Sequence, residues 1–492
     1  MQSCKIIIKD EVNIKIEGLD LSVRKKLESA LKFMQPHAYH VPSYKLGRWD
    51  GCIRFFNIGG STYINALPVI LPILEEEGYS IDIDDQRTKW NFEFKEITND
   101  YFSNKTWPAK HPKEFEPIEL FDHQREVINH FLKDPQCVQE IATSAGKTII
   151  TAGLSNIVEK YGRSMVIVPN KDLVVQTETD YKNLGLDVGV YYGDRKEYGK
   201  MHTICTWQSL EVIKKNFRDG KNEMSLDDFA KDVVCIIVDE THRAKSDVLR
   251  DLLIKNFGNI PIRWGLTGTI PESEVDKWSI KIALGETINA LPAHVLQEKG
   301  LIANCDISII QTHDDVFYDN YQSEMTYLTT DPRRLDQLAD AIRDISQTGN
   351  TLVLVDRIKA GKGLMERLPD DAVFISGSTK QVDRKEEYDK VADSTNKIIV
   401  ATYGVAAVGI NIPRIFNLVL IEPGKSFVRV IQSIGRGIRK AKDKDHVKIW
   451  DITSDAKFSK RHLTKRKKFY KDAKYPFKVN KVDYPFKIKT SL

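Results

Sequence analysis

The sequence predicts an α/β protein with two parallel-sheet domains in tandem, a small α/β domain before them and a basic extension after them. Two sets of short apolar segments alternate with amphipathic stretches, which is typical of parallel strands covered by helices on both faces. The first set comprises residues 137–141, 164–168, 203–205, 233–238 and 264–266, and the second comprises residues 351–355, 372–375, 397–400, 418–421 and 447–450. We place the four parts at residues 1–105, 106–295, 296–455 and 456–492.

The composition predicts a globular protein of the cytoplasm. Of the 492 residues, 29% are charged and 41% are hydrophobic, as in folded water-soluble domains. No run of 18 apolar residues occurs, and the first apolar run is too short for a signal peptide, so we expect no membrane segment. The six cysteines are scattered, without a C-x-x-C pair or a histidine at ligand spacing. This predicts reduced thiols rather than disulfides or a zinc site.

Charge is distributed unevenly along the chain. Residues 456–492 contain 13 Lys and Arg against two Asp, a charge of +11, whereas the whole chain carries +4 and the remainder therefore −7. Such a tail suits a polyanion, although a solvated terminus would have the same composition. The tail repeats Tyr-Pro-Phe-Lys at 475–478 and 484–487. These aromatics could stack on bases or pack the tail onto the preceding domain, and we favour a basic helix followed by a docked extension.

The N-terminal part begins with two apparent strands, residues 5–9 and 12–16, which could pair as a hairpin. Apolar residues at helical spacing then predict a helix over 21–33. In residues 44–56, the Asp50-Gly51 pair predicts a turn between two short strands.

The residues around that turn allow two interpretations. Arg48 and Arg54, beside Trp49, could form a stacking and phosphate-binding surface. A hairpin with a packed tryptophan explains the same residues equally well.

The segment from Ile141 to Thr148 reads Ile-Ala-Thr-Ser-Ala-Gly-Lys-Thr and connects an expected strand to an expected helix. It follows the G-x-x-x-x-G-K-[ST] phosphate-loop pattern except that Ile141 replaces the first glycine. Free N–H groups at the helix N-terminus favour an anion there. We expect Lys147 to reach the β- and γ-phosphates of a nucleotide and Thr148 to bind Mg²⁺. An ordinary strand-to-helix turn is the alternative.

Asp239 and Glu240 directly follow the apolar segment 233–238. Ligands of open α/β sheets bind at the carboxyl ends of strands. We therefore expect Asp239 to hold Mg²⁺ and Glu240 to activate the attacking water, although a helix N-cap pair is the alternative.

Arg436 and Arg439 are three residues apart, so on a helix they would share one face. They could neutralise charge on a γ-phosphoryl group, as arginine fingers do. On their own, the two arginines would fit a solvated helix face better.

Together these residues resemble superfamily 2 helicases, and most closely the phage UvsW-type DNA helicases. The resemblance covers roughly residues 115–455. Its motifs occur in the family's order: Gln124, Thr143–Thr148, Ile167–Gln176, Thr206–Leu210, Asp239–His242, Leu266–Thr269, Ala401–Thr402 with Gly409–Pro413, and Gln432–Arg439. The Thr-Ser-Ala-Gly-Lys loop and the N-terminal segment Gly47–Arg54 resemble the UvsW branch in particular.

The resemblance implies two RecA-like domains with ATP and Mg²⁺ as cofactors. It gives His242 a catalytic role beside Asp239 and Glu240, and it makes Thr267 and Thr269 coupling residues. The implied nucleotide-binding residues are Phe121, Gln124, Thr143, Ser144, Ala145, Gly146, Lys147, Thr148, Gly409 and Gln432. The implied nucleic-acid contacts are Arg48, Trp49, Arg54, Thr206, Gln208 and Thr402.

The function implied is that of a monomeric ATP-dependent helicase or translocase, in the host cytoplasm if phage-encoded. It would act on single-stranded, forked or branched DNA, or on RNA–DNA hybrids, by branch migration, fork regression or R-loop removal. An RNA helicase is one alternative. A strand-annealing or duplex-clamping protein in which ATP only switches affinity is another.

Overall fold

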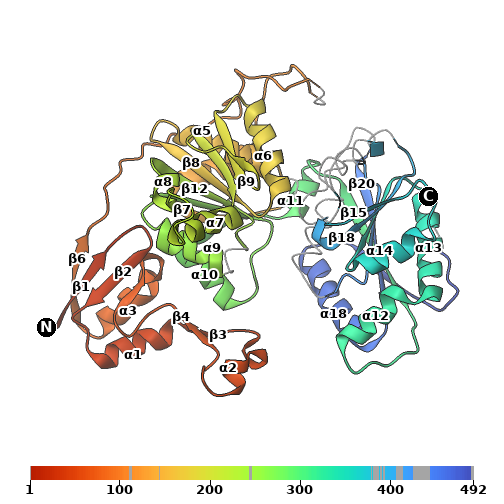
Figure 1. Cartoon of the computed structure of the whole chain (residues 1–492), viewed down its shortest axis with the longest axis horizontal. Helices are drawn as coiled ribbons and strands as arrows, with labels where there is room; N and C mark the ends of the chain where they lie inside the picture. The colour runs from red at the N-terminus through yellow and green to blue at the C-terminus, as the bar shows by residue number, and fades with distance from the viewer. Residues whose placement is uncertain are drawn as a thin grey trace. The chain divides into compact units, whose positions relative to one another are not determined.

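The computed structural model describes residues 2–109, 113–142, 145–242, 247–377, 379, 387, 390–391, 394–405, 414–424 and 444–488. The chain divides into two compact units (Figure 1). The first contains residues 1–141 and 146–290, and the second contains residues 142–145 and 291–492. No helix within the described ranges has the length and apolar character needed to cross a bilayer.

The first unit begins with a four-stranded sheet in the order β5-β2-β1-β6. The predicted hairpin is confirmed, because β1 (Gln2–Ile8) and β2 (Asn13–Glu17) pair antiparallel. Side chains alternate along β2, where Ile14 and Ile16 are buried. Strands β5 (Ser61–Tyr63) and β6 (Tyr79–Asp85) complete the sheet, and helices α1 (Leu21–Ala30) and α3 (Leu67–Glu76) pack together beside it.

In this region, the predicted end of the first helix and the predicted partner of one strand are wrong. The first helix stops at Ala30, and β3 (Lys32–Met34) pairs antiparallel with β4 (Cys52–Arg54). The partner of β4 is thus β3 rather than a strand just before Asp50. The intervening chain contains α2 (Pro42–Lys45), because Pro42 at its first position presets the helical φ.

This N-terminal part shares its core with the parallel sheet that follows. Phe33 and Phe55 stack on Trp278, and their ring centroids lie 5.5 and 5.8 Å from the centroid of the Trp278 ring. Asn13 donates a side-chain hydrogen bond to the carbonyl of Ile254 at 2.9 Å. The two regions therefore pack as one apolar cluster, while the domain boundary at residue 105 stays a prediction.

The mainly parallel sheet of the first unit has the strand order β10-β9-β11-β8-β12-β13-β7-β14, with β10 antiparallel to β9 at one edge. All five predicted strands are confirmed, as β7 (Gln136–Ile141), β8 (Arg163–Val168), β11 (His202–Thr206), β12 (Val233–Asp239) and β13 (Ile262–Thr267). Strands β9 (Val188–Tyr192), β10 (Arg195–Lys196) and β14 (Glu286–Leu291) were not predicted from the sequence.

Helices cover both faces of this sheet. Ile236 and Val238 of β12 share an apolar cluster with residues of α7 (Trp207–Arg218) and α10 (Glu274–Leu284). On the opposite face, Ser164 of β8 donates to Ser155 of α5 at 3.1 Å. Helix α5 (Lys147–Val158) packs between α4 (Asp122–Lys133) and α6 (Lys171–Asn183). The shorter helical segments are α8 (Leu226–Phe229), α9 (Asp247–Asp251) and η4 (Leu252–Asn256).

The second unit is built on a parallel sheet in the order β17-β18-β16-β19-β20-β15-β21. The five predicted strands are confirmed, as β16 (Thr351–Val355), β17 (Val373–Ile375), β18 (Ile398–Thr402), β19 (Asn417–Ile421) and β20 (His446–Ser454). Strands β15 (Asn304–Thr312) and β21 (Phe477–Val482) were missed. Described helices are α11 (Ala293–Glu298), α12 (Tyr321–Thr330), α13 (Pro332–Ser346), α14 (Ile358–Met365) and α18 (Lys457–Asp472).

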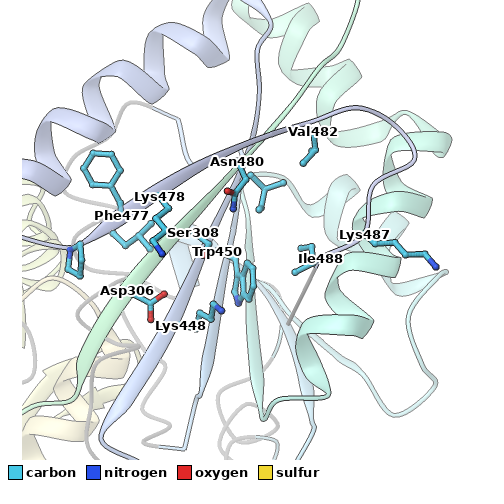
Figure 2. A pocket seen from close by; sticks show the side chains of 13 residues that line it. Asp306, Ser308, Lys448, Trp450, Phe477, Lys478, Asn480, Val482, Lys487 and Ile488 are labelled. Carbon is cyan, nitrogen blue, oxygen red and sulfur yellow. The ribbon is translucent and has the colours of Figure 1, made fainter. Parts of the chain in front are cut away.

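The basic C-terminal extension is part of this unit, which confirms the favoured prediction of a helix with a docked extension. Helix α18 is followed by β21, which pairs parallel with β15 at the edge of the sheet. Tyr475 and Phe486 of the two repeats are buried, at 5% and 8% exposure. Between the extension and the sheet lies a groove of about 590 Å³ that includes Trp450, Lys448, Lys478 and Lys487 (Figure 2).

Candidate nucleotide site and nucleic-acid contacts

The candidate nucleotide site begins where β7 ends and α5 starts. Gly146 precedes the helix with φ +82°, a left-handed conformation that side chains disfavour. A Cβ atom added to Gly146 would lie 2.3 Å from Nε2 of Gln124. The backbone therefore favours a glycine here, and a larger residue would also displace the end of the Gln124 side chain. Ala145 is buried, whereas Thr143 and Ser144 lie outside the described residues.

Lys147 connects this loop to the end of β12. Its Nζ lies 3.1 Å from Oε1 of Glu240, and the two side chains are only 12% and 13% exposed. Glu240 has φ +57°, a strained conformation for a non-glycine residue and one often found at functional positions. The parallel sheet thus brings together two residues that are 93 positions apart in the sequence.

The neighbouring carboxylates have opposite pKa shifts. Burial raises the pKa of Asp239 to about 6, although Lys147 offsets part of that effect. Burial also acts to raise the pKa of Glu240, but the charge of Lys147 and the interaction with His242 outweigh it and hold that pKa below its usual range. Asp239 Oδ1 accepts the backbone N–H of Glu240 at 2.9 Å. Near neutral pH, the Glu240 carboxylate is therefore ionised.

His242 extends the contacts from Glu240 to the end of β13. Its Nδ1 lies 3.2 Å from Glu240 Oε2 and 3.2 Å from Thr267 Oγ1. Thr267 donates its hydroxyl proton to the carbonyl of Thr269 at 2.8 Å. Since a hydroxyl has one proton, Thr267 can only accept from His242, and the hydrogen of that imidazole is assigned to Nδ1.

The predicted adenine-binding residues lie beside the loop at the start of α4. Gln124 Oε1 accepts the backbone N–H of Phe121 at 3.0 Å, and Gln124 is only 6% exposed. Phe121 is half exposed and its ring stacks on His123 with centroids 5.7 Å apart. The sequence alone did not reveal the contact between Gln124 and Gly146, because no local pattern links the two positions.

The site contains residues suitable for a nucleotide and its cation. Thr148 is the second residue of α5, and Asp239 is the last residue of β12. Oγ1 of Thr241 is buried without a hydrogen-bond partner in the described part of the chain, and Glu240 Oε2 lies 3.2 Å from His242 Nδ1. Hydroxyl and carboxylate oxygens suit Mg²⁺ with a phosphate, so the predicted ligands Thr148 and Asp239 have the chemistry that would hold the ion.

The predicted nucleic-acid contacts of the two sheets lie at or next to strand ends. Thr206 caps α7, accepting the N–H of Ser209 at 3.3 Å, and is only 6% exposed. Gln208 is exposed and donates to the carbonyl of Pro169 at 3.3 Å. Thr402 is half buried at the end of β18 in the second unit. Of the three, Gln208 offers the most accessible side chain.

Two of the three N-terminal candidates, Arg54 and Trp49, have partners within the N-terminal part of the chain. Arg54 forms ion pairs with Asp50 at 2.6 Å and with Glu28 at 2.9 Å. Trp49 is half-buried and donates its indole N–H to the carbonyl of Cys52 at 3.0 Å. Arg48 is exposed. Both interpretations of Trp49 and Arg54, as DNA contacts or as packed residues, therefore stay predictions.

The remaining candidates, Gly409, Gln432, Arg436 and Arg439, lie outside the described residues, and their roles stay predictions.

Comparison with known proteins gives matches along most of the chain. Residues 117–272 match the family model "Type III restriction enzyme, res subunit", and residues 333–441 match "Helicase conserved C-terminal domain". The ATP-dependent DNA helicase uvsW of Enterobacteria phage T4 is 24% identical over 449 residues, covering 87% of this chain and 86% of that protein.

Two further matches are more distant. Putative helicase 22 of a Sulfolobus islandicus filamentous virus is 23% identical, covering 74% of this chain and 67% of that protein. A solved fragment of a putative HsdR subunit of a type I restriction enzyme from Vibrio vulnificus shares the fold, with a TM-score of 0.55 and 15% identity over 96% of this chain and 85% of that chain.

The fold and the two matched family models define an ATP-dependent helicase built on two sheets of parallel strands. The chain belongs to the superfamily 2 helicases.

Proposed function

We propose that this helicase acts on DNA and that its substrates are single-stranded, forked or branched. The proposed reactions are branch migration, fork regression and removal of RNA from RNA–DNA hybrids. The support for DNA is the match to a phage T4 protein named as an ATP-dependent DNA helicase, which extends over 87% of the chain.

The observation that carries the motor mechanism is the path of contacts from Lys147 through Glu240 and His242 to Thr267 and Thr269. It connects the phosphate loop to the ends of two neighbouring strands. A change at the phosphates can thus reach Thr267 and Thr269 through side chains already in contact. We propose that this path couples ATP hydrolysis to movement on nucleic acid.

Glu240 acts as the general base in this proposal. Next to Lys147 its carboxylate has a depressed pKa and is therefore a weak base. When Lys147 instead contacts the β- and γ-phosphates, the pKa of Glu240 rises and the carboxylate can take a proton from water. Bound Mg²⁺ would supply charge neutralisation to the phosphates.

The remaining residues have the roles that the sequence predicts for them. Thr148 and Asp239 hold the cation, and Gln124 with Phe121 recognises the base. Arg436 and Arg439 neutralise charge that develops on the γ-phosphoryl group.

The test is the ATPase rate of the full chain with single-stranded DNA, duplex DNA, four-way DNA junctions, RNA–DNA hybrids or RNA. We expect DNA to stimulate hydrolysis and junctions to stimulate it more than linear duplex of equal length. Stimulation by RNA alone would support an RNA helicase instead. Binding without stimulated turnover would support an ATP-switched clamp.

A further inference from the structure

The chain makes a strained turn where β19 leaves the second sheet. Glu422 has φ +43° and Gly424 has φ +66°. Glutamate is not the residue expected for such a backbone, so other contacts must hold it there. In the sequence, Gln432, Arg436 and Arg439 follow Gly424 by 8, 12 and 15 positions.

Glu422 is held through both carboxylate oxygens. Oε1 accepts from Arg334 Nη2 at 2.7 Å, and Oε2 accepts from the hydroxyls of Thr453 at 3.1 Å and Ser459 at 2.5 Å. Glu422 and Arg334 are each 2% exposed. A buried charge of this kind is tolerated only when its partners are in place, so these contacts restrict the side chain to one position.

Arg466 holds the other end of the turn. Its Nε and Nη2 donate to the two oxygens of Asp451 at 2.8 and 2.9 Å, while Nη1 donates to the carbonyl of Gly424 at 3.0 Å. Arg466 is 3% exposed. The planar guanidinium can bridge a carboxylate and a carbonyl simultaneously, whereas a lysine ammonium lacks this geometry.

Ser459 and Arg466 both belong to α18, the helix of the C-terminal extension. The start of α18 is itself fixed, because Glu324 accepts the N–H groups of Phe458 and Ser459 at 3.0 and 2.8 Å. Further along the extension, the hydroxyl of Tyr484 donates to Asp314, which pairs with Arg334 at 2.8 Å. The extension therefore contacts the network around this turn from both α18 and its final segment.

We propose that the C-terminal extension positions the arginine motif for ATP hydrolysis, with Ser459 and Arg466 as its positioning residues. They fix the turn from Glu422 to Gly424, the last described residues before the motif in the sequence. This inference rests on the proposed function, in which Arg436 and Arg439 act on the γ-phosphoryl group. It gives the extension a role in turnover beyond contact with a polyanion.

The test is steady-state ATPase of the full chain with Ser459→Ala and with Arg466→Lys. Ser459→Ala removes one hydroxyl, and Arg466→Lys keeps a charge for Asp451 but gives up the bridge to Gly424. We expect each to lower kcat by about 10- to 100-fold, as small misplacements of reacting groups do, with KM for ATP within about twofold. Thr464→Ala is the control, because Thr464 is exposed on α18 and its hydroxyl bonds only within the helix.

Two further variants separate failure of this inference from failure of the proposed function. Arg439→Ala should lower kcat, and adding Ser459→Ala to it should lower kcat little further, because the residue being positioned is already gone. If Arg439→Ala hydrolyses ATP at the normal rate, the proposed role of the arginine is wrong. If Arg439→Ala is slow but folded Ser459→Ala and Arg466→Lys are normal, the positioning role is overturned. A fully multiplicative double variant would also overturn it.

Discussion

At the scale of single residues, Glu240 combines burial, a strained backbone and a contact with the phosphate-loop lysine. We predict that Glu240→Gln retains ATP binding but loses about 10²- to 10⁴-fold in hydrolysis rate, because the amide cannot take a proton from water. Lys147→Ala should lose hydrolysis as well. Nucleotide binding and single-turnover hydrolysis measure the two effects, with Glu274→Gln as the control on the surface of α10. Normal hydrolysis by Glu240→Gln would contradict the assignment.

The burial of Asp239 lowers the free energy of unfolding at neutral pH, where its carboxylate is charged. Its pKa is raised to about 6 from an ordinary value of 3.8, so its contribution to stability is present below pH 3.8 and is lost as the pH rises through 6. Asp239→Asn should therefore raise the melting temperature at pH 7.5, by on the order of 5 °C, and have little effect at pH 3.5. The same variant should hydrolyse ATP poorly.

Melting curves of the nucleotide-free protein at both pH values test this prediction about Asp239. Asp227→Asn is the control, since Asp227 is exposed on α8. An equal change in melting temperature at the two pH values would show that burial of Asp239 is not the cause.

At the scale of elements, the turn into α5 depends on Gly146. Gly146→Ala and Gly199→Ala both place a side chain at a positive φ, +82° and +84°, and each should cost about 1–2 kcal/mol of stability. Only Gly146 faces Gln124, whereas a Cβ on Gly199 meets nothing within 4 Å. Gly146→Ala should therefore also weaken ATP binding, by about tenfold or more. Calorimetric titration and melting curves separate the two effects, and equal ATP affinity in both variants would contradict the role of the loop.

The sequence predicted elements well where a local pattern is sufficient. Segments such as Val233–Val238 are continuously apolar because parallel strands are buried on both faces, and the structure has a strand at each predicted position. It failed for β21 (Phe477–Val482), whose sequence Phe-Lys-Val-Asn-Lys-Val is largely exposed at the sheet edge. The sequence predicted the wrong partner for β4, because the actual partner β3 lies about 20 residues earlier and long-range pairing has no local signal.

The contacts of the candidate site also divide into those that the sequence predicts and those that it does not. Topology alone places Lys147 near Glu240, since parallel strands end at one edge of the sheet. The contact of Gln124 with Gly146, and the contacts of Glu422 with Ser459, depend on tertiary packing and have no local signal in the sequence.

At the scale of the whole molecule, the positive charge of the C-terminal extension can be tested separately from its contribution to the stability of the second unit. Because β21 and buried residues of α18 belong to the second unit, truncation would remove part of the fold together with the charge. Four exposed lysines of α18, Lys465, Lys467, Lys468 and Lys471, can instead be replaced by glutamine. This removes four of the 13 basic side chains of residues 456–492 while leaving Arg466 and Ser459 in place.

We predict that this fourfold variant binds DNA more weakly regardless of sequence and depends less on salt. For each phosphate that the protein no longer neutralises, the slope of log affinity against log salt falls by about 0.9 on duplex DNA and about 0.7 on single strands. The melting temperature and the ATPase rate without DNA should stay close to those of the unmodified chain, because none of these lysines lies in the network around Glu422. Binding isotherms at several salt concentrations measure the slope. An unchanged slope would mean that the basic face of α18 does not contact DNA, leaving the extension with its packing and positioning roles alone.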